Sequence, residues 1–494
     1  MERKLKMSLF LIMLLPLGLF AQNMAGSSAE KAIITVADTG HTIISRDIYG
    51  LFSEHLGRGI YDGIYYKGQI RQDIVQALKA ISLPNLRWPG GCFADQYHWR
   101  DGIGDKAKRP KTVNTTWGMV SEDNSFGTEE FIELCKQIGC QPYIAGNVGT
   151  GSPQEMKDWV TYLNYDHHYN VSYWGVGNES WGCGGNMTPE YYADLYNHFA
   201  AFLPNYSGTH LKKVISGANA DDYHWTEVMM RNIGPDNNAW GLSLHYYTFP
   251  TGGFRPRGSA TDFNEMEYTH TLVEAEKIDT IIEHHERIMD QYDPKKQLAL
   301  CVDEWGVWTD VAPGTPGYAM YQQSSLRDAL VAATTLNIFN NHADRIRLAN
   351  LAQTVNVIHA LILTKGDQMI KTPTYWVFEL YKAHQDARLL PIQIQSPEYA
   401  GVKAVNASAS VRGDTILVTL VNLDPQNSIT VSAALPKNCS QVSGQILHNE
   451  RFNAINTFET PDRVKPQTFN GAQINAKQLT FTLPPLSVVA LTLK

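Results

Sequence analysis

Short apolar segments alternate with helical patterns between residues 44 and 385, and this alternation restricts the folds that the chain can adopt. Helix signals separate the segments: Ser152 and Thr188 are capping residues, each followed by a proline, and Gly139 ends another helix. Alternating strands and helices build parallel sheets, and eight strands close into a barrel. We therefore predict an α/β fold with a (β/α)8 TIM barrel over 44–385. The eight predicted strands are 48–54, 85–89, 141–147, 171–179, 213–219, 240–247, 298–304 and 345–353.

The periodicity changes after residue 385. Short segments rich in β-branched residues, at 415–422, 428–432, 478–483 and 487–493, are separated by turn residues. This pattern is typical of an antiparallel β-sandwich, which we predict over 386–494. A segment of the same character precedes the barrel, so we expect a strand from 31–43 to join the sandwich. No low-complexity linker divides the two parts, which favours firm packing between them.

The N-terminus has the pattern of a secretory signal. Basic residues (Arg3, Lys4 and Lys6) precede an apolar run that ends at Phe20, and the small residue Ala21 follows. The run is too short for a membrane span and lacks anchoring flanks. We predict a cleaved signal peptide over 1–21, with cleavage after Ala25 as the alternative, and export to the periplasm or the extracellular space.

Charge and aromatic content limit the partners. The formal net charge is −8, and without residues 1–21 the chain has an even larger acidic excess. An acidic protein is a poor nucleic-acid binder, because nucleic acids require a positive surface. The 24 tyrosines and 11 tryptophans fit a carbohydrate site, where sugars rest on aromatic rings, but they are equally typical of a large core.

No metal or cofactor is implied. The cysteines lack zinc-type spacing, and a chain of this length forms a core without disulfides. We therefore expect mostly free, buried thiols, although the sequence does not exclude one disulfide bridge. Glu283 to Glu286 includes two histidines without the helical spacing of a zinc site, which favours a solvated helix face. No glycine-rich phosphate loop follows the first strand.

Two glutamates stand directly after predicted strands. Glu179 follows the fourth strand in Gly177-Asn178-Glu179, and Glu304 follows the seventh strand. Barrel enzymes place their chemistry at the carboxyl ends of the strands, where loops meet at one rim. Two carboxyl groups at such a rim are the acid and the nucleophile or base that glycoside cleavage requires.

Other strands end in polar residues at the same rim. Since buried polar groups cost free energy unless they are paired, a purely structural barrel has no need of them. We expect them to form a binding site. The residues are Glu54, Arg87, Cys92, Asn147, Asn178, His245, Tyr247 and Gln353.

The chemistry needs one protonated and one ionised carboxyl group. If Glu179 and Glu304 lie about 5 Å apart, repulsion and burial keep one protonated, and the other attacks the sugar with retention of configuration. A wider gap with room for water gives inversion. Arg87 is the natural electrostatic support for the ionised partner. The sequence leaves the separation open.

Longer motifs resemble a known enzyme family. Asn178-Glu179 after a fourth strand and Glu304 after a seventh resemble the retaining barrel hydrolases of clan A. Three strings narrow the resemblance: the segment 48–57, the Arg87-Trp-Pro-Gly-Gly string, and the segment 348–357 with its Gln353. Together with His98-Trp-Arg-Asp-Gly and Asp303-Glu-Trp-Gly-Val-Trp308, they look like the α-L-arabinofuranosidases of glycoside hydrolase family 51, over essentially the whole mature chain.

The resemblance implies roles for individual residues. Glu179 would be the general acid/base and Glu304 the nucleophile. The arabinose ring would bind to Glu54, Asn178, Tyr247 and Gln353, with Trp305 and Trp308 shaping the pocket and Arg87 and Cys92 completing the rim. Cys92 departs from relatives that carry asparagine there, and a thiol is a weaker hydrogen-bonding group.

We therefore expect an exo-acting retaining enzyme that removes terminal arabinofuranose from arabinan, arabinoxylan or derived oligosaccharides. The resemblance also suggests a homo-oligomer, often a hexamer. One rival interpretation is an endo-acting β-glucanase or xylanase on the same barrel, since fold alone does not fix the substrate. Another is a carbohydrate-binding protein without catalysis, although both carboxyl groups are present.

Several residues have alternative interpretations. Glu54 could pair with Arg58 or Arg87 instead of binding a sugar. His55 and His245 are expected to support or pack against the site, because a retaining mechanism needs no histidine base. Trp181 and Cys183 could line the leaving-group side or only order their loop.

Overall fold

The computed structural model describes residues 30–494 except 207 and 236–238, so the predicted signal peptide lies outside the described residues. Eight parallel strands form a closed barrel, with neighbours in the order β10-β11-β12-β13-β2-β5-β8-β9. The predicted barrel is confirmed, and every predicted strand segment overlaps one barrel strand. These are β2 (Gly50–Phe52), β5 (Asn85–Trp88), β8 (Gln141–Gly146), β9 (Tyr173–Val176), β10 (Lys212–Asn219), β11 (Gly241–Thr248), β12 (Ala299–Val307) and β13 (Ile346–Ala352).

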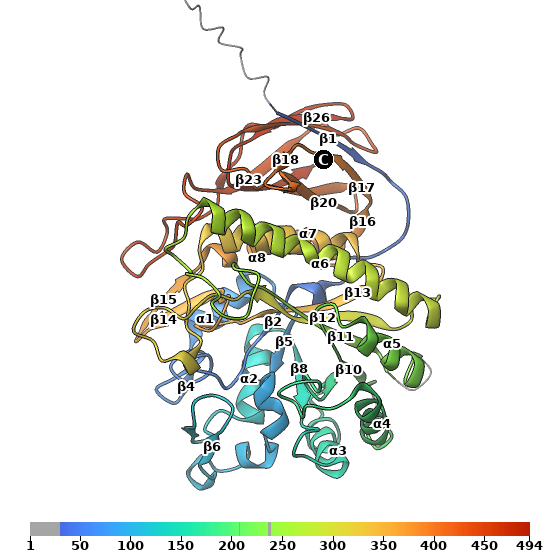
Figure 1. Ribbon diagram of the computed structural model, residues 1–494, viewed down its shortest axis with the longest axis vertical. Helices are drawn as coiled ribbons and strands as arrows, with labels where there is room; N and C mark the ends of the chain where they lie inside the picture. Colours follow the sequence, from blue (N-terminus) through green and yellow to red (C-terminus); the bar gives the residue numbers. More distant parts are fainter. Residues whose placement is uncertain (1–29, 207, 236–238) are drawn as a thin grey trace, which may run out of the picture.

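Helices surround this barrel (Figure 1). Their ends follow the sequence signals: the Ser152 side chain accepts a hydrogen bond from the Glu155 amide, and Gly139 adopts φ of +85° after a helix. No helix of the described residues is both long and apolar enough to cross a membrane. The helices are α1 (Gln72–Ala80), α2 (Thr128–Ile138), α3 (Pro153–Thr161), α4 (Pro189–Ala200), α5 (Tyr223–Asn232), α6 (Glu265–Tyr292), α7 (Leu326–Asn341) and α8 (Pro373–Tyr381).

Three small antiparallel hairpins lie in loops of the barrel domain. They pair β3 (Tyr65–Tyr66) with β4 (Gln69–Ile70), β6 (Thr112–Asn114) with β7 (Val120–Glu122), and β14 (Ile362–Lys365) with β15 (Gln368–Lys371). The sequence pattern did not predict them, because strands of two to four residues are too short to show a hydrophobic period.

Two sheets form the C-terminal domain. The first contains β16 (Arg388–Leu390), β20 (Val405–Arg412), β21 (Thr415–Asn422), β27 (Ser487–Leu493), β23 (Val442–His448) and β24 (Gln467–Thr468), in this order. The second runs β17 (Ile392–Gln395), β1 (Lys31–Val36), β22 (Ile429–Ala434), β26 (Gln478–Leu483) and β25 (Gln473–Asn475). A short hairpin of β18 (Glu398–Tyr399) and β19 (Val402–Lys403) completes the domain.

Strand β1 comes from the N-terminal side of the barrel and pairs inside the C-terminal domain. It is antiparallel to β17 but parallel to β22, so the sandwich, predicted as antiparallel, includes one parallel pair at β1. The whole barrel separates β1 from β22 in the sequence, so no tight turn imposes an antiparallel direction on the pair. The alternating burial of β1 places Ala32, Ile34 and Val36 in the core between the sheets.

Helix α7 lies between the barrel and the sandwich (Figure 1). All its residues from Leu326 to Asn340 are buried. On the sandwich side, Asn337 accepts hydrogen bonds from Ser408 and Thr419, each at 2.8 Å. His384 is also bonded to Thr419. These buried polar contacts tie helix α7 and His384 to the first sheet of the sandwich.

Candidate active site

The two predicted carboxyl groups meet at the carboxyl ends of the barrel strands. Glu179 lies in the loop after β9, and Glu304 lies within β12. One oxygen of Glu179 lies within 4.8 Å of one oxygen of Glu304, and a ring nitrogen of His245 lies within the same limit of both. The side chain of Glu179 is 17% exposed and that of Glu304 is 7% exposed. The pair is therefore shielded from bulk water but not sealed from it.

Arg87 and Tyr247 hold Glu304. The Arg87 guanidinium donates to Oε1 of Glu304 at 2.7 Å, and the Tyr247 hydroxyl donates to Oε2 at 2.8 Å. A second nitrogen of Arg87 donates to Oδ1 of Asn178 at 2.6 Å. Hydrogen bonds to a carboxylate favour its ionised form. This environment suits a nucleophile.

Asp303 is a further carboxylate beneath the pair. Strand neighbours normally point to opposite faces, but the register of β12 shifts against both adjacent strands near this point, so Asp303 and Glu304 both reach the interior. Tyr143 donates to Asp303 at 2.7 Å, and Ser243 donates to its other oxygen. Burial opposes ionisation of Asp303, but nearby Arg87 and the hydrogen bond from His245 outweigh it and lower its pKa to about 2.

His245 links the three carboxyl groups. Its Nδ1 lies 2.9 Å from Glu179 and 3.7 Å from Glu304, and its Nε2 lies 3.3 Å from Asp303. Burial lowers the pKa of His245, but the surrounding carboxylates raise it further, to about 10. At neutral pH the ring is a cation that donates from both nitrogens, so it supports the site and does not act as a base.

Glu179 has the environment of an acid. Burial raises its pKa, and the negative charge of Glu304 adds to this, while the hydrogen bond from His245 works in the opposite direction. A carboxyl group with a raised pKa stays protonated to a higher pH, as a proton donor requires.

The predicted sugar-binding residues also converge here. Oε1 of Glu54 accepts from the Gly91 and Phe93 amides, each at 3.0 Å, and Oε2 accepts from Gln353 at 3.3 Å. Burial, with Glu304 nearby, raises the pKa of Glu54 to about 7. Oε1 of Gln353 and Nδ2 of Asn178 are buried without a hydrogen-bond partner among the described residues. Such groups are suited to sugar hydroxyls.

Glu54, His55 and Asn147 each have contacts that bear on their roles. Glu54 forms no ion pair with Arg58, which instead donates to the Thr364 carbonyl. His55 packs among aromatic rings, accepts from Trp88 and lies 3.5 Å from Glu122. The Asn147 side chain caps its own loop by accepting from the Thr150 and Gly151 amides.

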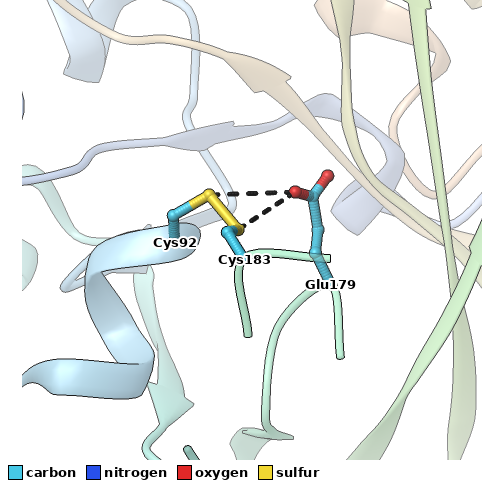
Figure 2. Close-up of side chains that lie close together, drawn as sticks. All are labelled: Cys92, Glu179 and Cys183. Carbon is cyan, nitrogen blue, oxygen red and sulfur yellow. Dashed lines mark hydrogen bonds between the residues drawn. A yellow bond between two sulfur atoms is a disulfide. The ribbon is translucent and has the colours of Figure 1, made fainter. Parts of the chain in front are cut away.

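Cys92 is not a thiol. It forms a disulfide with Cys183, which corrects the expectation that Cys92 offers a weak thiol hydrogen bond to the sugar (Figure 2). A disulfide sulfur has no hydrogen to donate. Four cysteines are free and buried, as expected, namely Cys135, Cys140, Cys301 and Cys439.

Trp305 and Trp308 occupy different environments. Trp305 is 2% exposed and packs against Phe339 and Phe378 on the helix side of the barrel. It does not face the carboxyl groups, which corrects the expectation that it shapes the pocket. The ring of Trp308 lies 4.9 Å from that of Tyr247, and Tyr247 contacts Glu304. Trp308 therefore borders the site.

Asp95 is a buried residue of the site that the sequence reasoning missed. It lies in η2 (Cys92–Gln96), and its carboxylate accepts from the amides of Val148, Gly149 and Asn178. It thereby ties the loop after β8 to the loop that holds Glu179. In the sequence, Asp95 closely follows the Gly90-Gly91 pair after the second predicted strand, and this position could have indicated that it belongs to the site.

The cluster of Glu179, His245 and Glu304 also has the spacing of metal ligands. The Arg87 guanidinium bonded to Glu304 and the cationic His245 already supply two positive charges. A divalent cation would have to displace them, so the electrostatics favour a carboxyl pair without a metal.

Comparison with known proteins identifies the family. A model described as the alpha-L-arabinofuranosidase 1 domain matches residues 77–257, and one described as the alpha-L-arabinofuranosidase C-terminal domain matches 303–487. The crystal structure of a GH51 arabinofuranosidase from Xanthomonas axonopodis pv. citri is 45% identical, with a TM-score of 0.91 over 94% of this chain and 100% of that one. The chain belongs to the α-L-arabinofuranosidases of glycoside hydrolase family 51.

Two other relatives cover almost the same length. An intracellular exo-alpha-L-arabinofuranosidase from Bacteroides ovatus is 44% identical over 96% of this chain and 98% of its own length. The α-L-arabinofuranosidase from Thermotoga maritima, solved as an arabinose complex, is 28% identical with a TM-score of 0.81, over 94% of this chain and 99% of that one.

The Bacteroides relative overturns one expectation about this family 51 member. It is named as an intracellular enzyme, which contradicts the export that we predicted from residues 1–21. An apolar run after basic residues has the composition of a signal, but composition alone does not decide whether the export machinery recognises it.

Proposed function

We propose that this protein is an exo-acting, retaining α-L-arabinofuranosidase that releases terminal arabinofuranose from arabinan, arabinoxylan or oligosaccharides derived from them. The observation that carries the proposal is the Glu179–Glu304 pair: their oxygens lie within 4.8 Å of each other, both oxygens of Glu304 accept hydrogen bonds, and the pKa of Glu179 is raised. That spacing is close to the roughly 5 Å of retaining glycosidases and shorter than the roughly 6.5–9.5 Å of inverting ones, so it suits direct attack by one carboxylate. We infer the identity of the sugar, arabinofuranose, from the family to which the chain belongs.

In the first step, Glu304 attacks the anomeric carbon while Glu179 protonates the departing glycosidic oxygen. Arg87 and Tyr247 orient the nucleophile, since both donate to it. A covalent arabinosyl-enzyme forms. In the second step, Glu179 takes a proton from water, and this water releases the sugar with its original configuration.

The pocket residues fit a single furanose ring. Glu54, Asn178 and Gln353 lie around the carboxyl pair, and two of them present unpartnered buried polar atoms. We assign these three to the sugar hydroxyls and Trp308 to the wall of the pocket. The nearly buried carboxyl groups favour a terminal sugar in a pocket over a polymer lying in an open cleft.

The proposal is tested with 4-nitrophenyl α-L-arabinofuranoside and with Glu179→Ala and Glu304→Ala variants in the presence of azide. We expect Glu179→Ala to give a retained glycosyl azide, because azide replaces the water that the missing base would activate. Glu304→Ala should give the inverted product, because azide then attacks in place of the nucleophile. Full activity of Glu304→Ala would refute the assignment.

The rival endo-acting function is tested with the same preparation. Incubation with β-glucan and xylan should release no internal fragments, whereas arabinan or arabinoxylan should release free arabinose. Internal cleavage of β-glucan without arabinose release would replace the proposal by the rival enzyme.

A further inference from the structure

A disulfide crosses the active-site rim. Cys92 begins η2 after β5, and Cys183 lies in the loop between β9 and α4. Strand β8 separates β5 from β9 in the barrel, so the bridge connects loops of strands that are not neighbours. It also spans 91 residues of sequence. The bridge therefore ties the Cys92 side of the rim to the loop that holds Glu179.

The loop after β9 turns back on itself at Glu179. The backbone of Glu179 has φ of +39°, in the left-handed region that non-glycine residues rarely adopt. Its carbonyl accepts hydrogen bonds from the Gly182 amide at 2.7 Å and the Gly184 amide at 3.1 Å. This tight turn brings Cys183 beside the side chain of Glu179. Only glycine fits at 184, because a Cβ atom there would lie 1.7 Å from the Asn178 carbonyl oxygen.

Both sulfurs lie against the same carboxyl oxygen (Figure 2). Oε2 of Glu179 is 3.3 Å from the sulfur of Cys183 and 3.8 Å from that of Cys92. The other oxygen, Oε1, is 2.9 Å from Nδ1 of His245. Cationic His245 donates its hydrogen to Oε1, so the acidic proton of Glu179 belongs on Oε2. The disulfide thus contacts the oxygen that carries the transferable proton.

A disulfide and two thiols affect that oxygen differently. A disulfide sulfur can only accept a weak hydrogen bond, so it is compatible with a protonated Oε2. A thiol can donate a hydrogen bond, which favours the ionised carboxylate. Opening the bridge would also remove the covalent tie of the strained loop. Both changes oppose the role of Glu179 as a proton donor.

We propose that the Cys92–Cys183 disulfide is a positioning group for the general acid: it holds Oε2 of Glu179 in place and keeps hydrogen-bond donors away from it. The inference rests on the proposed function of Glu179. It predicts that opening the bridge impairs proton donation to the leaving group more than the attack by Glu304. Substrates that depend on this proton should therefore suffer most.

The test compares two substrates on oxidised and reduced enzyme. Dithiothreitol breaks the S–S bond, the two cysteines become thiols, and the reagent becomes a cyclic disulfide. We expect kcat/KM for methyl α-L-arabinofuranoside, whose leaving group needs a proton, to fall about 10- to 100-fold. For the 4-nitrophenyl substrate, whose leaving group departs without one, kcat/KM should change by less than about threefold.

A pH profile is an independent readout. Reduction should move the alkaline limb of kcat/KM for the methyl substrate to lower pH, because a donated hydrogen bond favours ionised Glu179. The charged groups around Glu179 are His245, Glu304, Asp303 and Arg87, and the reagent breaks no bond in any of them. A merely structural bridge would not move this limb.

Variants separate the tie from the hydrogen bonding. Cys92→Ala/Cys183→Ala removes the tie without adding donors, and Cys92→Ser/Cys183→Ser removes it and adds donors. We expect the serine pair to show the larger loss on the methyl substrate. Cys439→Ser, in the sandwich core, is the matched control and should match wild type on both substrates, with and without dithiothreitol.

Three outcomes would overturn the inference. Equal losses on both substrates would mean that the bridge only stabilises the loop. Unchanged activity after complete reduction, verified by thiol titration, would mean that the bridge has no role in proton transfer. Six free thiols in the untreated protein would mean that the bridge does not form. Reduction of the folded protein provides the test even if the variants do not fold. If the oxidised wild type cleaves neither substrate, the proposed function itself has failed.

Discussion

Arg87→Met should damage both the activity and the stability of the enzyme. Arg87 donates to Glu304 at 2.7 Å and to Asn178 at 2.6 Å, and its Nε lies 3.8 Å from Asp303. The side chains of Arg87 and Asp303 are each only 2% exposed. Removing one partner of a buried ion pair costs about 3–5 kcal/mol because the other charge stays buried, and we expect this loss in the free energy of unfolding. Losing a preorganised donor at the reacting group should reduce kcat/KM about 10²- to 10³-fold.

Urea unfolding and kcat/KM with the 4-nitrophenyl substrate measure the two effects. Arg46→Met is the matched control, because Arg46 forms an exposed pair with Asp386, with side chains 60% and 40% exposed. Exposed pairs contribute about 0–1 kcal/mol, and this variant should keep wild-type activity. Arg87→Lys should fall between wild type and Arg87→Met, because lysine keeps the charge but loses the fork that reaches two acceptors. An Arg87→Met enzyme with kcat/KM within about threefold of wild type would refute the reasoning.

Three further predictions follow from the geometry. Trp308→Ala should raise KM for arabinofuranosides, because Trp308 borders the site. Trp305→Phe should leave KM unchanged and lower only the melting temperature, because Trp305 packs against helices. Equal effects of the two variants on KM would contradict the assignment. Gly184→Ala should abolish most activity by displacing the Glu179 loop, whereas Gly182→Ala, whose Cβ would lie 3.7 Å from the nearest atom, should be close to wild type in steady-state kinetics. Burial lowers the pKa of His384 to about 3, whereas an ordinary histidine has a pKa of about 6.5. Between these two pH values the unfolded chain binds a proton at this position and the folded protein does not. The free energy of unfolding should therefore fall as the pH decreases through this window. His384→Gln removes this titrating group. The slope of the free energy of unfolding against pH, measured by urea unfolding between pH 7 and pH 4, should then decrease by the equivalent of up to one bound proton.

The strand pattern predicted the barrel and the position of the carboxyl pair. Glu179 and Glu304 each follow an apolar run, and the carboxyl ends of parallel strands meet at one rim, so their convergence follows from local sequence and barrel geometry. Their separation did not follow, because it depends on side-chain directions and on the register shift in β12.

That shift also explains why Asp303 was missed. The alternation of side chains along a strand places Asp303 and Glu304 on opposite faces, and no residue type in the segment predicts a β-bulge. The same alternation would have placed Trp305 correctly on the face opposite Glu304. The resemblance to a family motif outweighed it and wrongly assigned Trp305 to the pocket.

The pairing of Cys92 with Cys183 could not be predicted either. Their loops follow strands that are not neighbours in the barrel, so their distance depends on how each loop folds over the rim. His245 shows a related limit. Its position at a strand end was visible, but its charge is set by three carboxyl groups that only the folded chain assembles around it.

The place of β1 has a consequence for biosynthesis. Ile34 of β1 pairs with Ile394 of β17 on one side, and Ile33 pairs with Ser432 of β22 on the other. The ribosome therefore makes one of the first strands long before its partners, and the barrel must emerge in between. Until then β1 has two unpaired edges, which are prone to aggregate. The sandwich can only close after nearly the whole chain has been translated, so its closure is the last checkpoint of folding.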